Sequence, residues 1–393
     1  MSTEKKFDAV MAGGGLMGCA TAYYLMLQDP TLKVAIVEME PSYEHNSTVL
    51  SDGNTRLQFN IKENIQISQY ALEKLKTFSE DMAVGEWKPN PDFRQQGNIF
   101  LTDEANKENL VAGMKAQQAL GADVKWLEPD DVLEFCPLFD KSQFAGGVYG
   151  RLDGTMDPQA ILVGFQRKAV DLGATFIEAE VAEVLQADGK VTGVKLTNGE
   201  VLNAKYVLNS AGAWGTKLAK TVGIDLPIDP VMRTVFVVQT DVVPEKPYPF
   251  VAFPSGMYLI HEHGNQFTTA KSLDTDPIGF DFTWNREDFI ENLWEELVGY
   301  VPSFDRLKVV SGWAGLYAVN NFDGNAFLGE WPELEGFILV NGFSGHGFQQ
   351  AHAIGRYLAE LIRGVDYSLD LSIFSPKRLL ENKPVFEGHG KIV

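Results

Sequence analysis

Cysteine is scarce in this sequence, whose 393 residues include only Cys19 and Cys136. Two cysteines provide neither a disulfide framework nor a cysteine-rich metal site, so we expect both to be small buried side chains. The chain also lacks a run of about 20 apolar residues, which a membrane-spanning helix requires. Its first residues, MSTEKKFDAV, lack the charged and apolar regions of a signal peptide. These absences favour a soluble, cytoplasmic protein.

Positive charge is scarce as well. The chain has 33 Lys and Arg against 53 Asp and Glu, a formal net charge of −20. Nucleic acids and anionic membrane surfaces attract basic proteins, so we expect neither as a partner. With 45% hydrophobic residues the chain has enough apolar material for a core. Its length suits two domains or one large discontinuous one.

Strand-like and helix-like segments alternate along the chain. The first three, at 7–12, 16–28 and 33–38, predict a strand, a helix and a second strand, which together form a βαβ unit. Asn198-Gly199 between two short apolar runs predicts a hairpin. The further helices that we expect are 62–82, 103–120, 158–173, 286–300 and 348–363, and the further strands are 96–102, 175–178, 191–197, 200–202, 205–209, 257–261 and 337–340.

The segment 230–320 is richer in Val, Phe, Thr and Tyr, with proline turns between short runs, which is typical of an antiparallel sheet. We therefore predict an α/β fold (α+β overall) with two domains. The first is a Rossmann-like FAD-binding domain with a parallel sheet, and the second is a mostly antiparallel substrate-binding domain. The first would comprise 1–88, 145–225 and 321–393, and the second 89–144 and 226–320.

A dinucleotide-binding fingerprint stands at the expected place in the βαβ unit. The sequence GGGLMG at 13–18 satisfies G-x-G-x-x-G between the first strand and the first helix. Gly13 permits the tight turn, Gly15 lets a pyrophosphate approach the backbone, and Gly18 lets the helix pack on the sheet. Glu38 ends the second strand, where a carboxylate accepts hydrogen bonds from ribose and repels a 2′-phosphate. FAD or NAD fits this pattern, and NADP does not.

Further motifs lie near the middle and the C-terminus of the chain: GNTR at 53–56, NSAGAW at 209–214, GWAGLY at 312–317, DGN at 323–325 and GFSGHGF at 342–348. Together with the fingerprint they resemble the D-amino acid oxidase superfamily over nearly the whole chain. The resemblance is closest to its sarcosine oxidase, glycine oxidase and dimethylglycine dehydrogenase branch. It implies a flavoprotein that oxidises a small organic substrate with FAD.

The resemblance also implies which residues contact FAD, from the pyrophosphate to the isoalloxazine ring. Free N–H groups at the start of the helix 348–363 would stabilise negative charge on the reduced flavin, and Arg56 would add a cation near the ring. The implied contacts are Gly13, Gly15, Leu16, Met17 and Gly18 at the pyrophosphate, Glu38 and Met39 at the adenosine ribose, Val181 at the adenine, Ala211, Gly212 and Trp214 at the middle of the dinucleotide, Ser51, Thr55 and Arg56 along the ribityl chain and the ring, and Gly315, Gly345, His346, Gly347, Phe348 and Gln349 around the flavin.

Four positions depart from the family pattern. Members with covalent flavin carry a cysteine or a histidine where this chain has Gly315 and, roughly, Leu50, so we expect non-covalent FAD. Sarcosine oxidases bind the substrate carboxylate with basic residues at two positions where this chain has Phe59 and Gln349. Sarcosine itself is therefore not the expected substrate.

The lysine that helps oxygen react in such oxidases aligns here with Thr268 or Thr269. Dehydrogenase behaviour is therefore expected as much as oxidase behaviour, with oxygen or another molecule as electron acceptor. The sequence leaves the oligomeric state open.

The expected reaction is oxidation of a C–N bond in a small amine or amino acid, with a secondary or N-methyl amine as the favoured class. Hydride would pass from the carbon beside nitrogen to flavin N5, and water would hydrolyse the imine. Arg56 and Tyr317 are expected at the site, with Tyr258 orienting the substrate and His261 accepting its proton. His261 and His263 would share one strand face, but a third ligand is lacking, so we expect no metal.

Two alternatives stay open from the sequence. One is an FAD-dependent dehydrogenase or oxidase of a hydroxy acid or polyol phosphate, because the fold does not choose between C–N and C–O substrates. The other is a flavin-bearing assembly factor without turnover.

Overall fold

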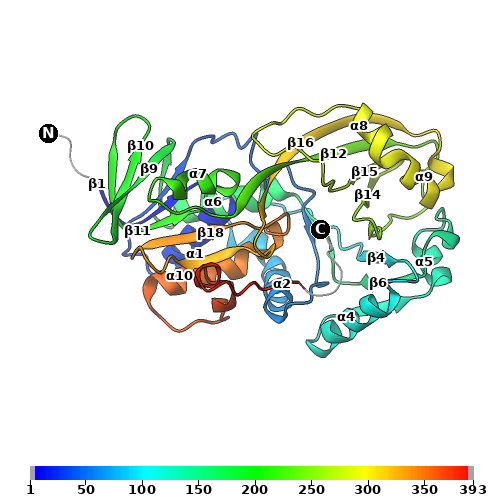
Figure 1. Ribbon diagram of the computed structural model, residues 1–393, viewed down its shortest axis with the longest axis horizontal. Helices are drawn as coiled ribbons and strands as arrows, with labels where there is room; N and C mark the ends of the chain where they lie inside the picture. The colour runs from blue at the N-terminus through cyan, green and yellow to red at the C-terminus, as the bar shows by residue number, and fades with distance from the viewer. Residues whose placement is uncertain (1–4, 388–393) are drawn as a thin grey trace.

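The computed structural model describes residues 5–387, and within them the longer strands form two eight-stranded sheets (Figure 1). The first sheet has the order β17-β18-β11-β1-β2-β8, and the hairpin β9-β10 extends it from β11. Neighbours from β18 to β8 are parallel, whereas β17, β9 and β10 pair antiparallel. Its strands are β1 (Lys5–Ala12), β2 (Val34–Glu38), β8 (Thr175–Glu178), β9 (Val181–Ala187), β10 (Lys190–Leu196), β11 (Val201–Asn209), β17 (Phe327–Glu330) and β18 (Phe337–Asn341).

Helices cover one face of the first sheet. α1 (Leu16–Gln28) packs against α6 (Pro158–Asp171) and α10 (Ala351–Arg363), and α10 also contacts α2 (Lys62–Leu75). α1 and α10 approach closely because Gly355 has no side chain. A Cβ at this position would lie only 2.8 Å from the backbone of Ala20. A hydrophobic core fills this layer and fixes the start of α1 relative to the sheet.

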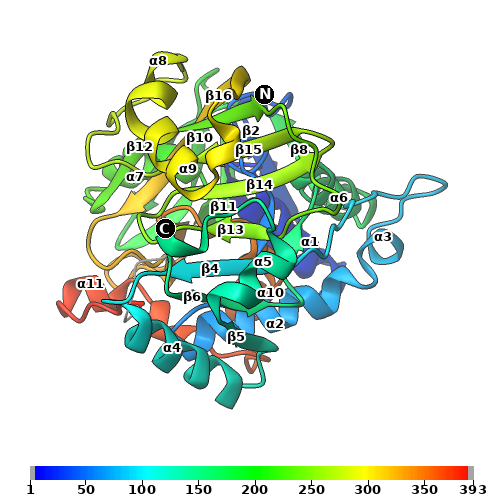
Figure 2. The same ribbon diagram turned by 90° about the vertical axis from the view of Figure 1, so that its right-hand side faces the viewer.

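The second sheet has the order β16-β12-β15-β14-β13-β4-β6-β5, and Figure 2 shows its strands one above the other. A hydrophobic core on one face includes side chains of α5 (Pro129–Phe135) and of the helical segment 287–300. The opposite face carries a smaller cluster that includes Phe100, Phe250 and Tyr258. The strands are β4 (Asn98–Thr102), β5 (Val124–Leu127), β6 (Gly146–Gly150), β12 (Ile228–Gln239), β13 (Phe250–Ala252), β14 (Tyr258–His263), β15 (Gln266–Ala270) and β16 (Lys308–Asn320).

The structure agrees with the predicted fold class, a mainly parallel sheet beside a mostly antiparallel one. The predicted helix 62–82 is in fact two, α2 and α3 (Phe78–Asp81), and the predicted helix 286–300 contains a π turn at Ile290–Trp294. The division into two domains stays a prediction. β6 pairs with β4 and β5, which would move its boundary from 145 to beyond Gly150.

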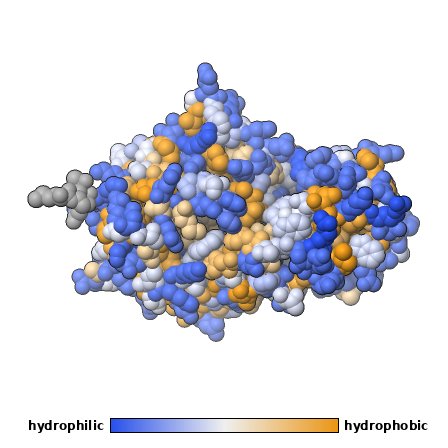
Figure 3. Space-filling view, turned by 90° about the horizontal axis from the view of Figure 1, so that it is seen from above, coloured by the Kyte–Doolittle hydropathy of each residue, from blue (hydrophilic) through white to orange (hydrophobic). Residues whose placement is uncertain are grey.

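The surface is largely hydrophilic on the face that Figure 3 shows. Hydrophobic side chains lie there in small groups among the hydrophilic ones. Cys19 and Cys136 are free and buried, as expected. Among residues 5–387, no helix is both long enough and apolar enough to cross a membrane.

The remaining elements are short or lie at the edges of the sheets. Two of them, β3 and β7, pair with each other. This pairing fixes the position of Asp52 and Gly53, which directly precede β3. Their bounds are β3 (Asn54–Thr55), β7 (Gly154–Thr155), α4 (Lys107–Ala119), α7 (Gly215–Lys220), α8 (Glu287–Phe289), α9 (Glu295–Tyr300) and α11 (Lys377–Leu380), with short turns η1 (Lys141–Gln143), η2 (Gly212–Trp214), η3 (Ile290–Trp294), η4 (Pro302–Phe304), η5 (Phe348–Gln350) and η6 (Ser372–Phe374).

Candidate active site

A cavity of about 410 Å³ lies at the carboxyl ends of β1, β2, β11 and β18. This edge of an open parallel sheet is where such folds bind nucleotides. The predicted cofactor residues that line it come from six separate stretches of the chain. They are Gly13, Gly15, Leu16, Met17, Glu38, Met39, Ser51, Val181, Ala211, Gly212, Trp214, Gly345, Gly347 and Phe348.

The three fingerprint glycines have different neighbours. Gly13 has φ +115°, and a Cβ there would lie 2.5 Å from the carbonyl oxygen of Ser210. A Cβ on Gly18 would lie 2.1 Å from the carbonyl oxygen of Gly13, so both positions require glycine for packing. A Cβ on Gly15 would meet only Asn46, at 3.1 Å, and Gly15 lines the cavity. A side chain at Gly15 would therefore occupy ligand space.

The start of α1 is suited to phosphate. No side chain caps this helix, and its first turn contains no acidic residue. The free N–H groups and the positive end of the helix dipole therefore face the part of the cavity that Gly15 lines. These features fit a pyrophosphate.

Glu38 lies at the end of β2 and lines the same cavity. Its Oε2 accepts a hydrogen bond of 2.9 Å from the backbone N–H of Gly14, and its Oε1 accepts one of 2.8 Å from that of Glu40. Burial raises the pKa of Glu38, and these backbone donors oppose the rise. Each oxygen keeps a lone pair for a ribose hydroxyl, which fits the predicted adenosine contact.

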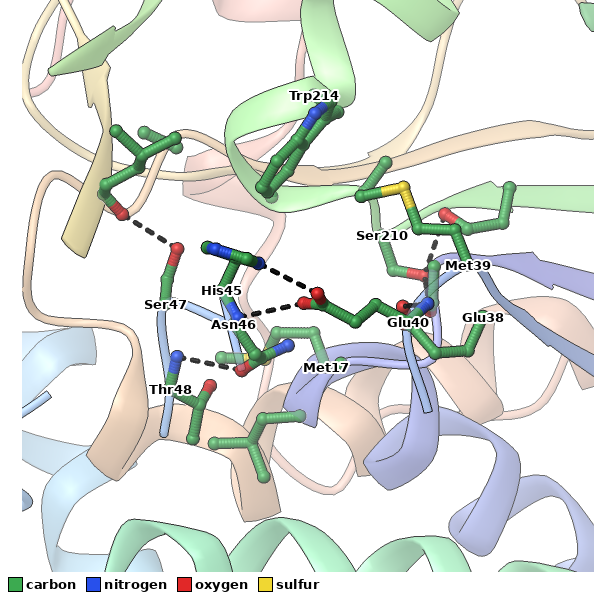
Figure 4. A pocket seen from close by; sticks show the side chains of 18 of the residues that line it. Met17, Glu38, Met39, Glu40, His45, Asn46, Ser47, Thr48, Ser210 and Trp214 are labelled. Carbon is green, nitrogen blue, oxygen red and sulfur yellow. Dashed lines mark hydrogen bonds and ion pairs between the residues drawn. The ribbon is translucent and has the colours of Figure 1, made fainter. Parts of the chain in front are cut away.

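Figure 4 shows side chains around this cavity, among them Glu38, His45 and Trp214. Nδ1 of His45 lies 2.8 Å from Oε1 of Glu40, and the ring of His45 packs against Phe282. Among the described residues, one group has a geometry that could hold a metal ion, and it consists of Glu40, Glu44 and His45. Glu44 is exposed, and both carboxylate oxygens of Glu40 already have hydrogen-bond contacts with His45, so this cluster gives no reason to revise the expectation of no metal.

A second cavity, of about 100 Å³, adjoins the first. The two share Ser47, Ser51, Leu316, Tyr317, Gly345 and Phe348, which connect the predicted flavin end of the first cavity to the second. The second cavity lies against the less covered face of the second sheet. Its apolar wall consists of Phe100, Val235, Phe250, Ala252 and Tyr258.

Three cationic side chains line the second cavity. The guanidinium carbon of Arg56 lies 4.8 Å from the ring centroid of Phe59. Arg233 forms an ion pair with Asp276. Lys271 forms an ion pair of 2.7 Å with Glu296. The cavity therefore contains three cationic side chains beside its apolar wall, and two of them are held in ion pairs.

A buried carboxyl group lies in the same cavity. The hydroxyl of Tyr258 donates a hydrogen bond to Oδ2 of Asp52. Oδ1 of Asp52 is also buried and has no hydrogen-bond partner among residues 5–387. Burial raises the pKa of Asp52 from 3.8 to about 7, although the hydrogen bond from Tyr258 acts in the opposite direction.

A family model described as "DAO: FAD dependent oxidoreductase" matches residues 8–361. The chain belongs to this family. FAD is therefore its cofactor, and the chain is an FAD-dependent oxidoreductase, as the resemblance predicted.

Some relatives of this chain are named after the substrate on which they act, and others are named only for their FAD-dependent domain. FAD-dependent oxidoreductase domain-containing protein 1 of Xenopus laevis is 33% identical over 98% of this chain and 84% of its own length. Sarcosine oxidase subunit beta of an Arthrobacter species is 25% identical over 98% of this chain and 94% of its own length. The structure of L-proline dehydrogenase from P. horikoshii superposes with a TM-score of 0.86 at 26% identity, covering 98% of this chain and all of that one.

Other residues that the sequence predicted to contact the flavin or the substrate line the second cavity. Tyr317 lines both cavities, and those that line only the second are Arg56, Gly315, His346, Gln349 and Tyr258. Burial lowers the pKa of His346 to about 3, so its ring is neutral near pH 7. Gly18 and Thr55 line neither cavity. Gly18 supports the turn below the first, and the hydroxyl of Thr55 donates to Oε1 of Gln349 at 3.2 Å.

The structure does not place His261 with the other candidates. Its Nδ1 accepts a hydrogen bond from the backbone N–H of Tyr248, and its Nε2 donates one to the carbonyl oxygen of Gly264. Its ring stacks on Phe267 in the core on the far side of the sheet. Tyr258 and His261 are three positions apart on β14, and side chains an odd number of positions apart point to opposite faces. We therefore withdraw His261 as a candidate base.

Three charged residues of the second cavity were missed from the sequence: Asp52, Arg233 and Lys271. Asp52 directly precedes the GNTR motif, and this adjacency was a usable signal. Arg233 and Lys271 lie in and just after strands of the second sheet, where the sequence contains no motif to mark them.

Proposed function

We propose that this FAD-dependent oxidoreductase oxidises the C–N bond of a small amino acid with a secondary or N-methylated amine. The observation that carries this proposal is the second cavity, where Arg56 and Arg233 lie together with the carboxyl group of Asp52. An amino acid has both a carboxylate and an ammonium group, which complement these charges. The volume of about 100 Å³ admits only a small substrate, since drug-sized ligands need several hundred Å³.

The position of the cavity supports the same proposal. It adjoins the end of the cofactor cavity where Tyr317, Gly345 and Phe348 lie, so a bound substrate would face the flavin. FAD, when bound, supplies the acceptor for two electrons. The protein residues hold the substrate carboxylate, orient the carbon beside nitrogen, and exclude water with the aromatic wall.

The names of two relatives add support. One relative is a subunit of sarcosine oxidase and another is L-proline dehydrogenase, and sarcosine and L-proline are both amino acids with a secondary amine. From the sequence, sarcosine is not the expected substrate, because Phe59 and Gln349 stand where basic residues bind its carboxylate. Arg233 on β12 provides a cation from another part of the chain, so both compounds belong in the substrate panel.

Anaerobic bleaching of the flavin band at about 450 nm tests the proposal directly. The panel contains N-methylglycine, L-proline, D- and L-amino acids with primary amines, larger secondary amines, and hydroxy acids. Bleaching by a secondary amino acid supports the proposal, and readmitted air shows whether oxygen accepts the electrons. Bleaching only by hydroxy acids would overturn it in favour of C–O oxidation. A loaded protein that nothing bleaches would favour a flavin-bearing protein without turnover.

A pair of matched ligands tests the carboxylate contact. Substituting Arg233→Met should weaken the binding of L-proline by about 10- to 100-fold, since a hydrogen bond to a charged group is worth about 1.5–3 kcal/mol. Pyrrolidine lacks the carboxylate, so its binding should change little. Equal losses for both ligands would show that Arg233 supports the cavity without binding the carboxylate.

A further inference from the structure

Asp52 and Tyr258 form a buried pair in the second cavity whose geometry leaves one carboxyl oxygen available. Oδ2 of Asp52 accepts the hydrogen bond from the hydroxyl of Tyr258, whereas Oδ1 has no partner among the described residues. Buried polar atoms in proteins are almost always hydrogen-bonded. Asp52 lines the second cavity, so its unpartnered oxygen is available to a donor group of a ligand that binds there.

The charged and titratable groups near Asp52 come from several elements. Tyr258 and Glu262 lie on β14, Tyr317 on β16 and Arg233 on β12. The others that line the cavity are Arg56, Lys271 and His346.

Several of these groups have partners of their own, which limits their influence on Asp52. Arg233 is paired with Asp276 and Lys271 with Glu296, and His346 is neutral near pH 7. Burial is the largest influence on Asp52, and Glu262 adds to it. The carboxyl group is thus partly ionised near neutral pH, which suits a group that takes up and releases a proton there.

We infer that Oδ1 of Asp52 accepts a proton from the protonated amine of the substrate before the substrate is oxidised. This inference rests on the proposed function. An aliphatic amine resembles the lysine side chain, with a pKa of about 10, so it enters as an ammonium ion. An ammonium nitrogen has no lone pair with which to form the C=N bond as hydride leaves the neighbouring carbon.

The step balances in atoms and charge. One N–H bond breaks and its electron pair stays on nitrogen, while an O–H bond forms on Oδ1, and nothing is oxidised or reduced. A cation and an anion become two neutral groups, which a low-dielectric cavity favours over separate buried charges. The hydrogen bond from Tyr258 holds the carboxyl group in place and directs the proton to Oδ1, so Tyr258 is a positioning residue.

The substitution Asp52→Asn tests the inference because it preserves the shape of the side chain and removes the base. The FAD-loaded wild type and variant are compared by anaerobic flavin reduction with L-proline and N-methylglycine from pH 6 to 10. The wild-type second-order rate should rise through pH about 7, where Asp52 ionises. The variant should be about 100- to 10,000-fold slower at pH 7.5, the usual contribution of general base catalysis. Its rate should rise tenfold per pH unit toward the pKa of the amine, and the difference should shrink there.

A second substrate makes the test independent of the variant. N-(2,2,2-Trifluoroethyl)glycine has an electron-poor amine that is neutral at pH 7.5 and needs no base. With this substrate the wild-type rate should lose its rise through pH 7, and Asp52→Asn should be nearly as fast as the wild type. A wild-type rise that persists unchanged with this compound would overturn the inference, even if the variant failed to fold or to bind FAD.

Ligand binding gives a readout that does not depend on turnover. Tetrahydrofuran-2-carboxylate has the ring of proline with an ether oxygen in place of nitrogen, and its binding is followed by the shift of the flavin spectrum. The ether oxygen accepts but does not donate a hydrogen bond, so ionised Asp52 should repel it. Its affinity for the wild type should fall as the pH rises through 7, and its affinity for Asp52→Asn should not.

The outcomes separate the inference from the proposed function. If secondary amines bleach the flavin and Asp52→Asn keeps the wild-type rate and pH profile, the inference fails and the proposed function stands. If no amine bleaches the wild type, both fail. Tyr258→Phe is the matched variant, since it keeps the carboxyl group and should lower the rate far less than Asp52→Asn while moving the pH midpoint upward.

Discussion

The backbone N–H of Arg56 donates a hydrogen bond of 2.6 Å to the side-chain Oε1 of Gln349. The two residues are 293 positions apart, and the hydroxyl of Thr55 donates to the same oxygen. Gln349 is 7% exposed and lies in the turn that follows Gly345 and Gly347. One amide oxygen therefore joins the loop that carries Asp52 and Arg56 to the turn between the two cavities.

Replacing Gln349 with leucine should loosen this junction. The N–H of Arg56 would lose its acceptor, and an unsatisfied buried group costs about 1–3 kcal/mol. We expect the free energy of unfolding in urea to fall by that amount, together with a slower anaerobic reduction of the flavin. Gln349→Glu is the control, because it keeps an acceptor oxygen at the same place. A leucine variant as stable as the glutamate variant would contradict the role of this hydrogen bond.

The parts of the site that the sequence predicted are those built from local pattern. The fingerprint at 13–18 and Glu38 belong to one βαβ unit, so their spacing alone places them around the pyrophosphate and ribose. Asp52 and Tyr258 meet across 206 positions through the folding of the second sheet, and their spacing in the sequence says nothing of that contact. The alternation of side chains along a strand did argue against His261. It lies three positions from Tyr258 on β14, so the two side chains point to opposite faces.

The long elements were predicted better than their interruptions. The helix expected at 62–82 stops at Leu75, because Phe78 turns into the core to pack against Phe165 and His352. Such a break depends on tertiary contacts, and the apolar spacing that continues through it gives no sign of it. The pairing of β6 with β4 and β5 likewise has no signal in the sequence, and it would move the predicted domain boundary at 145.

A side chain introduced at Gly15 should exclude FAD, and a larger side chain should exclude it more completely. A Cβ there approaches only Asn46, at 3.1 Å, so the apoprotein should tolerate Gly15→Leu while the pyrophosphate loses its place. We expect the ratio of flavin absorbance to protein absorbance to fall to near zero. Gly299→Ala on α9 is the control, because nothing lies within 4 Å of its added Cβ. A yellow, fully loaded leucine variant would refute the assignment of the first cavity to FAD.

Acid precipitation should release the flavin into the supernatant. Neither of the positions that align with covalent attachment in the family, Gly315 and roughly Leu50, has a nucleophilic side chain. His45 lines the cofactor cavity and provides the one imidazole close to this region of the sequence. Its Nδ1 is engaged by Glu40, so His45→Ala should release the same amount of flavin as the wild type. Colour that stays in the wild-type pellet and disappears from the His45→Ala pellet would instead identify a covalent bond at this residue.

The pH dependence of stability should report the burial of Asp52. Its pKa is about 7 in the folded protein and near 3.8 when the chain is unfolded, so the folded state binds more protons between these values. Stability must therefore fall as the pH rises through this window, by up to about 4 kcal/mol for a shift of about three units. Urea unfolding of the apoprotein at pH 4.5, 6, 7.5 and 9 should show this loss in the wild type relative to Asp52→Asn. The difference between the two proteins should be constant above pH about 8, where Asp52 is ionised in both states.

Tyr258→Phe extends the same measurement. The hydrogen bond from Tyr258 lowers the pKa of Asp52, so its removal should move the upper end of the stability loss above pH 7. The difference from Asp52→Asn should then continue to grow between pH 7.5 and 9, where the wild-type difference has nearly levelled off. Parallel stability curves for the wild type and Asp52→Asn would mean that the carboxyl group ionises at its ordinary pKa. Asp52 would then lack the pKa near neutral pH that a base at this site requires.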